Sequence, residues 1–122
     1  KRVVFLGFIS HEDMPKYLKV ADVFVRPSRS EGLGNSFIEA MAAGLPVIAT
    51  NVGGIPDFLT HGETGLFCEV DNHVSLASSV MTLLEDADLR SKVITKGREL
   101  AISEYNWENI AKDMEIKIFS KV

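Results

Sequence analysis

The sequence of 122 residues contains one cysteine, Cys68, and no apolar run near the roughly 18 residues that a membrane-spanning helix needs. A single cysteine excludes an internal disulfide and fits a reducing, cytoplasmic location. No signal peptide is recognisable. The net charge is −4 and the 13 Lys and Arg residues form no cluster, which argues against nucleic acid as a partner. His11, His61 and His73 lack the spacing of metal ligands, so we expect no metal site.

Several catalytic motifs are missing as well. The chain has no Gly-x-Ser-x-Gly, no phosphate-binding loop that ends in Lys-Ser or Lys-Thr, and no Gly-x-Gly-x-x-Gly. What remains is an ordinary globular composition, with 46% hydrophobic and 25% charged residues, in a length that suffices for one domain. Cys68 ends a short apolar run, and we interpret it as a small buried side chain and not as a nucleophile.

Short β-branched runs alternate with helical patterns, which predicts an α/β fold with a parallel sheet of about four strands and flanking helices. The expected strands are 3–6, 23–26, 47–50 and 65–68, and the expected helices are 13–21, 36–43, a short stretch at 57–60, and most of the chain from 72 onward.

Apolar spacing in the C-terminal part predicts which helix faces meet the core. The expected apolar stripes are Val74, Ala77, Met81 and Leu84; Leu89, Val93, Leu100 and Ala101; and, after a cap at Asn106, Trp107, Ile110, Ala111 and Met114. The aromatic residues Phe37, Phe67 and Trp107 are expected in the core.

The segment 28–50 carries the strongest chemical signal. A glycine-rich loop leaves a predicted strand and opens a helix, with Glu31 in the loop and Glu39 in the first turn of the helix. Glycines let a ligand approach the backbone closely, and the free N–H groups of a helix start attract anions. Carboxylates accept strong hydrogen bonds from sugar hydroxyls. These residues therefore favour a sugar nucleotide as the ligand.

Each feature also has a simpler explanation. The run from Ser36 to Glu39 has the Ser-x-x-Glu form of a capping box, in which the glutamate only satisfies a backbone N–H at the helix start. A lone loop carboxylate such as Glu31 is usually solvated, and Gly32 and Gly34 could simply form a tight turn. The chemistry of this loop stays open at the level of single residues.

Four short segments considered together point to a family. They are Pro27-Ser28-x-x-Glu31-Gly32-x-Gly34, Glu39-Ala40-Met41-Ala42-Ala43-Gly44-x-Pro46-Val47-Ile48-Ala49, Gly53-Gly54-x-Pro56-Asp57 and Gly62-x-Thr64-Gly65-Leu66. This pattern resembles the C-terminal domain of retaining GT-B glycosyltransferases, the large family that contains sucrose synthase-like and mannosyltransferase-like enzymes. Glu31 and Glu39 are separated by seven residues, as in that family's Glu-x7-Glu motif. The resemblance covers essentially the whole chain.

The resemblance implies that residues 1–122 are a single partial domain, with a Rossmann-like parallel sheet, from the C-terminal half of a GT-B fold. The intact enzyme would transfer a hexose from a UDP-, GDP- or ADP-sugar to an acceptor hydroxyl with retention of configuration, using no cofactor and no metal. Glu31 would be the catalytic residue beside the transferred sugar. The implied donor-binding residues are Ile9, Ser10, Gly32, Leu33, Gly34, Asn35 and Glu39.

Parts of the family pattern have no counterpart in this sequence. The family has two further upstream strands, which carry an Arg and a Lys that neutralise the diphosphate, and an N-terminal acceptor domain. We therefore expect the chain to be inactive without that missing N-terminal domain. The strand at 3–6 would lack its neighbours, which predicts a rearranged sheet or a homo-oligomer paired through the open sheet edge.

Two alternatives remain. One is a non-catalytic module that keeps the fold for assembly or regulation. The other is a different enzyme of the same architecture, a nucleotide-sugar epimerase or a glycogen-type phosphorylase, although no convincing motif for a pyridoxal-phosphate lysine is present. The sequence also leaves open a peripheral association of the intact enzyme with the inner membrane.

Overall fold

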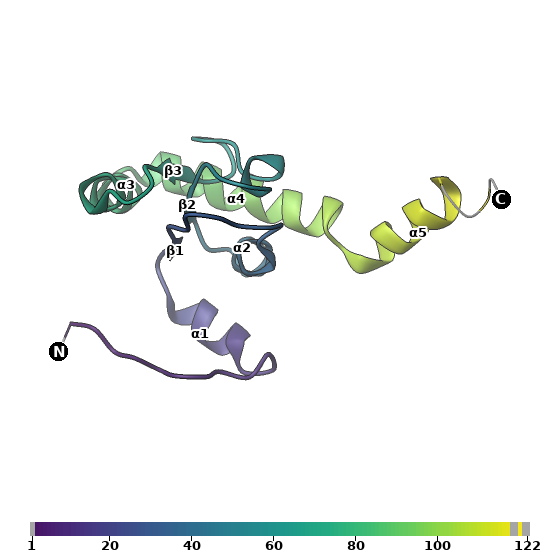
Figure 1. Ribbon diagram of the computed structural model, residues 1–122, viewed down its shortest axis with the longest axis horizontal. Coiled ribbons are helices and arrows are strands. Elements are labelled where there is room, and N and C mark those ends of the chain that lie inside the picture. Colours follow the sequence, from purple (N-terminus) through teal and green to yellow (C-terminus); the bar gives the residue numbers. More distant parts are fainter. Residues whose placement is uncertain (1, 118–119, 121–122) are drawn as a thin grey trace.

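Three parallel strands form the sheet in the computed structural model, which describes residues 2–117 and 120 (Figure 1). The strands are β1 (Phe24–Arg26), β2 (Val47–Thr50) and β3 (Leu66–Cys68), in the order β1-β2-β3. The helices are α1 (Met14–Val20), α2 (Asn35–Ala42), α3 (His73–Glu85), α4 (Ala87–Glu104) and α5 (Trp107–Lys117), and a 3₁₀ turn, η1, spans Ile55–Asp57. None of these helices is long and apolar enough to cross a membrane.

The central strand β2 is buried on both faces, because alternate side chains of a strand point to opposite sides of the sheet. Val47 and Ala49 belong to one core cluster with Phe37 of α2 and Ile55 of η1. Ile48 belongs to a second cluster with Leu83 of α3. α4 reaches both clusters, with Val93 in one and Ala101 in the other. Helices on both faces explain the continuous apolar run of β2.

The expected strand at 3–6 is wrong, and the sheet therefore has three strands instead of four. Residues 2–10 have no regular secondary structure and run past α1, apart from the sheet (Figure 1). Their side chains are largely exposed, with Phe5 and Phe8 each 95% exposed. A strand is stable only where its N–H and C=O groups have hydrogen-bond partners. Within the described residues no strand pairs with the outer edge of β1, and residues 3–6 therefore stay outside the sheet. Pairing of this edge with another copy stays a prediction.

The inward-facing stripe expected for the last helix is also wrong. α5 buries no residue and extends away from the sheet, and Trp107 is 81% exposed (Figure 1). The apolar spacing is present, but of the four expected residues only Ile110 is half-buried and the others are exposed. The stripe expected for α3 is wrong too: Val74, Ala77, Met81 and Leu84 are all exposed, and a neighbouring stripe with Leu83 and Val80 meets the sheet instead. The stripe expected for α4 is confirmed.

A turn between η1 and β3 is joined to α4 by ion pairs. The Glu63 carboxylate accepts from Lys92 at 2.5 Å and also from Lys96, one turn further along the helix. Gly97 of α4 lies against the same turn, because an added Cβ would come 3.1 Å from the Thr64 carbonyl oxygen. These contacts hold α4 against the sheet.

This pair of bonds should give a pH-dependent stability. The hydrogen bonds from Lys92 and Lys96 lower the pKa of Glu63 from 4.5 to about 2. A lowered pKa stabilises the folded chain above the unfolded value of 4.5, and the contribution is lost as the pH falls through about 2. The melting temperature of Glu63→Gln should therefore lie below that of the unmodified chain at pH 7, and the difference should shrink between pH 4.5 and 2.

Thermal unfolding followed by circular dichroism measures this difference. High salt should also reduce it, because the three side chains are partly exposed and screened. Glu99→Gln, an exposed substitution on α4, is the matched control. A difference that stays constant from pH 7 to 2 would contradict the assigned role of Glu63.

Candidate functional site

The glycine-rich loop connects β1 to α2 across the carboxyl end of the sheet. Pro27 ends β1 because it has no N–H to donate to the ladder. Gly34 is the N-cap of α2 with φ 73°, a left-handed conformation that favours glycine. A Cβ at Gly34 would come 2.7 Å from the Phe37 ring. Glycine is therefore required where the chain turns into α2.

The capping-box explanation for Glu39 is wrong. α2 begins at Asn35 after the Gly34 cap, so Ser36 lies inside the helix, and α2 has no side-chain cap hydrogen bond. The Glu39 side chain is 41% exposed and faces His11, with His11 Nε2 4.0 Å from Glu39 Oε1. The Glu39 carboxylate is consequently available to a ligand.

The backbone amides of the loop are also available. Among the described residues, the N–H groups of Gly32, Leu33, Gly34 and Asn35 donate to no protein acceptor. They precede or begin α2, where the helix dipole adds partial positive charge. Four such groups in succession form a site suited to an anion such as a phosphate.

Glu31 is held in place and is not a solvated loop carboxylate. Its side chain is only 12% exposed. The Ser28 hydroxyl donates to Glu31 Oε2 at 2.9 Å, and Arg26 Nε lies 3.2 Å from the same oxygen. Arg26 Nη1 also donates to the Ser36 hydroxyl at 2.8 Å. The carboxylate is thus tied to the end of β1 and to the first turn of α2.

The end of β2 and the loop that follows it contact the backbone of the glycine-rich loop. The Thr50 hydroxyl donates to the Ser28 carbonyl oxygen, and the Gly54 N–H donates to the Gly32 carbonyl oxygen at 3.2 Å. A Cβ at Gly53 would lie 1.8 Å from the Glu31 carbonyl oxygen. The two loops meet because the carboxyl ends of adjacent parallel strands lie at the same edge of the sheet.

A hollow of about 640 Å³ opens beside α2 and includes three of the residues expected to bind the donor, Leu33, Asn35 and Glu39. Glu31 is not among its lining residues. The other lining residues are His11, Ile38, Ala42, Ala101, Ile102, Tyr105, Asn106, Trp107 and Ile110.

The segment 9–11 lies next to this hollow through His11. The hydroxyl of Ser10 is not free to donate to a ligand, because it donates to Asp13 Oδ2 at 3.0 Å just before α1. Ile9 is half-buried. From the sequence we considered His11 only as a candidate metal ligand. Its position directly after Ile9 and Ser10 was the signal that could have linked it to the donor site.

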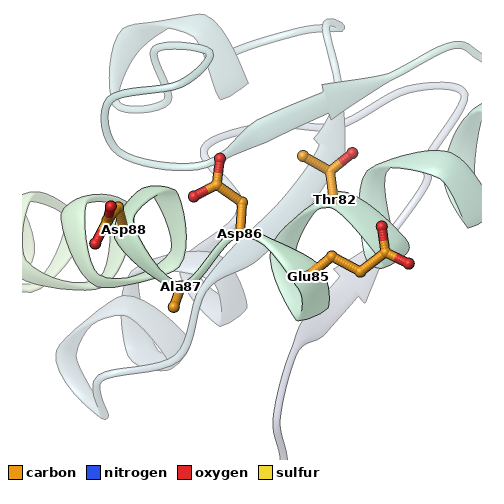
Figure 2. A pocket seen from close by; sticks show the side chains of 5 residues that line it. All are labelled: Thr82, Glu85, Asp86, Ala87 and Asp88. Carbon is orange, nitrogen blue, oxygen red and sulfur yellow. The ribbon is translucent and has the colours of Figure 1, made fainter.

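A second hollow, of about 490 Å³, lies at the junction of α3 and α4. Figure 2 shows the carboxylates of Glu85, Asp86 and Asp88 around it, with Thr82. Asp86 caps α4 by accepting from the Leu89 N–H at 2.9 Å. This hollow contains none of the expected site residues, and the helix cap accounts for its central carboxylate.

The model of the glycosyl transferases group 1 family matches residues 1–100. The chain belongs to this family. A curated relative, the GDP-mannose-dependent alpha-(1-6)-phosphatidylinositol monomannoside mannosyltransferase of Mycobacterium tuberculosis, is 37% identical over 116 residues. The match covers 89% of this chain and 30% of the relative. The chain spans about a third or less of the curated relatives it matches.

Solved structures of the family have the same fold. HepE from Anabaena in complex with UDP and glucose superposes with a TM-score of 0.89 at 27% identity, over 98% of this chain and 32% of HepE. Sucrose-phosphate synthase from Thermosynechococcus elongatus gives a TM-score of 0.88 at 37% identity, over 99% of this chain and 31% of the synthase. The α/β fold is that of the C-terminal domain of GT-B glycosyltransferases.

Proposed function

We propose that the protein containing this chain transfers a hexose from a nucleotide diphosphate sugar to an acceptor hydroxyl with retention of configuration. In this proposal residues 1–122 are a partial domain that supplies part of the donor site, and transfer requires the rest of the enzyme. The observation that carries this proposal is the run of four unpaired N–H groups at residues 32–35, which lie in the sequence between Glu31 and Glu39. Family membership supports the reaction class.

Each group has a separate task in this site. The N–H groups of residues 32–35 bind the diphosphate and the adjoining sugar, assisted by the positive end of α2. The Glu39 carboxylate accepts hydrogen bonds from the two ribose hydroxyls. The Glu31 carboxylate accepts from the hydroxyls of the transferred sugar. Segment 9–10 lies beside the nucleobase, a position supported by the approach of His11 to Glu39.

The reaction itself depends on electrostatic stabilisation. The bond between the anomeric carbon and the diphosphate oxygen breaks, so positive charge develops on the sugar and negative charge on the leaving group. Glu31 stabilises the first and the amides of residues 32–35 stabilise the second. The acceptor oxygen then bonds to the same face of the anomeric carbon, and its proton passes to the departing phosphate oxygen.

The nucleobase and the sugar of the donor have to be measured, because the relatives use different donors. HepE was solved with UDP and glucose, whereas the mycobacterial relative is GDP-mannose-dependent. The first experiment is therefore to compare the affinities of this chain for UDP, GDP and ADP.

We expect Glu39→Gln to weaken binding of the preferred nucleoside diphosphate by about 10- to 100-fold, because hydrogen bonds from hydroxyls to a charged group contribute about 1.5–3 kcal/mol. Isothermal titration measures the affinity, and amide-resolved NMR follows the signals of residues 32–35. Glu99→Gln, which is exposed on α4, should bind like the unmodified chain. Equal affinity of Glu39→Gln, or no binding by the unmodified protein, would refute the donor site and favour a non-catalytic module.

A further inference from the structure

We propose that Arg26 is a positioning residue for Glu31: it fixes one carboxylate oxygen and leaves the other for the donor sugar. This inference rests on the proposed function, because it assumes that Glu31 meets the sugar. It adds a residue of β1 to a site that the sequence placed entirely between residues 31 and 39 and at residues 9–10.

Arg26 connects three elements with one guanidinium group. It stands at the last position of β1. Its Nε lies 3.2 Å from Glu31 Oε2 in the loop, and its Nη1 donates to the Ser36 hydroxyl in the first turn of α2 at 2.8 Å. Two nitrogen atoms of a planar, rigid group therefore set the distance between the loop and the helix.

The two oxygens of Glu31 are used differently. Both Arg26 and Ser28 bind Oε2, at 3.2 and 2.9 Å. Among the described residues no protein group donates a hydrogen bond to Oε1, yet no buried side-chain polar atom there lacks a hydrogen-bond partner. Oε1 must therefore reach the surface of the protein. An anchored oxygen and a free one form the arrangement that a carboxylate needs in order to accept a bond from a sugar hydroxyl at a fixed place.

The positive charge of Arg26 also stabilises the Glu31 carboxylate. The Glu31 side chain is 12% exposed, and a carboxylate with so little water needs a positive partner. Arg29, in the same loop, pairs with Asp71 at 2.8 Å and is not bound to Glu31. Arg26 is the described cation that lies in salt-bridge range of this carboxylate.

The test compares Arg26→Lys with Arg29→Lys in the full-length protein. Lysine keeps the positive charge, but its single flexible ammonium replaces the rigid planar group whose Nε and Nη1 face Glu31 and Ser36 separately, so it no longer fixes the geometry between them. The assay follows release of nucleoside diphosphate from UDP-glucose, GDP-mannose or ADP-glucose, and titration gives the affinity for the nucleoside diphosphate alone. Melting temperatures establish that each variant is folded.

Arg26→Lys should lower kcat about 10- to 100-fold, because a misplaced catalytic group costs rate, while the affinity for the nucleoside diphosphate changes less than twofold. Arg29→Lys should match the unmodified protein in both. Ser36→Ala should lower kcat less, and the double variant should be no worse than Arg26→Lys, since both remove the same bridge.

Equal turnover by Arg26→Lys and the unmodified enzyme would overturn the inference and leave the proposed function standing. A parallel loss of turnover and of nucleoside diphosphate affinity would also overturn it, because the role would then be structural. An unmodified protein that releases nucleoside diphosphate from none of the three donors would overturn the proposed function, and this inference with it.

Discussion

Replacement of Glu31 by glutamine is expected to reduce sugar transfer about 100- to 1,000-fold, with little change in the affinity for the nucleoside diphosphate. Glutamine keeps the size of the side chain and an oxygen that can accept from the Ser28 hydroxyl. It removes the negative charge that the proposed mechanism places beside the developing positive charge of the sugar. Loss of one preorganised electrostatic contact typically lowers kcat by 10²–10³.

Steady-state rates and titration together separate this effect from a binding defect. The expected pattern is opposite to that of Glu39→Gln, which should weaken binding of the nucleotide itself. Glu99→Gln again serves as the control for removal of an exposed carboxylate. A Glu31→Gln variant that retains at least a tenth of the original kcat would mean that Glu31 serves only the architecture of the loop.

Gly53→Ala should lower the free energy of unfolding by about 2–5 kcal/mol. Gly53 has φ +56°, and the left-handed conformation costs a residue with a Cβ roughly 1–2 kcal/mol. The new Cβ would lie 1.8 Å from the Glu31 carbonyl oxygen and 2.8 Å from its carbonyl carbon. Both are backbone atoms that cannot rotate away, and overpacking adds about 1–3 kcal/mol. Because the loop that carries Glu31 must move, binding of the donor should fall as well.

Two other glycines separate the contributions, and urea unfolding measures all three variants. Gly62 has φ +76° with nothing within 4 Å of an added Cβ, so Gly62→Ala should show the conformational cost alone. Gly32 has neither a positive φ nor a close neighbour, and Gly32→Ala should change the stability by less than about 0.5 kcal/mol. If Gly53→Ala were no worse than Gly62→Ala, the close packing of the two loops would be disproved.

The sequence predicted those elements whose signals are local. The runs that became β2 and β3, the helix after the glycine-rich loop and the apolar stripe of α4 appear close to their expected residues. Val47–Thr50 was recognisable because β-branched residues between Pro46 and the following turn favour a buried strand. Phe37 was correctly expected in the core, where it contacts the rings of Phe24 and Phe58.

The errors concern segments that need a partner distant in sequence. Residues 3–6 have the composition of a strand, but composition supplies no neighbour, and the described part of the chain offers none. The same holds for α5, in whose apolar stripe only Ile110 is half-buried and Trp107 is exposed. At Ser36 the error was one of boundary, because Gly34 and not Ser36 caps α2.

By itself the sequence determined the family pattern and the place of the glycine-rich loop, because residue type and spacing decide where the backbone can turn; that this loop binds a sugar nucleotide is our proposal. Only the tertiary structure decided how that loop is held. It brought Arg26 to Glu31 and into a hydrogen bond with Ser36, ten residues along the chain, and it brought His11 to Glu39. These contacts depend on strand register and helix position, which arise when the whole core packs and which no short run of residues specifies.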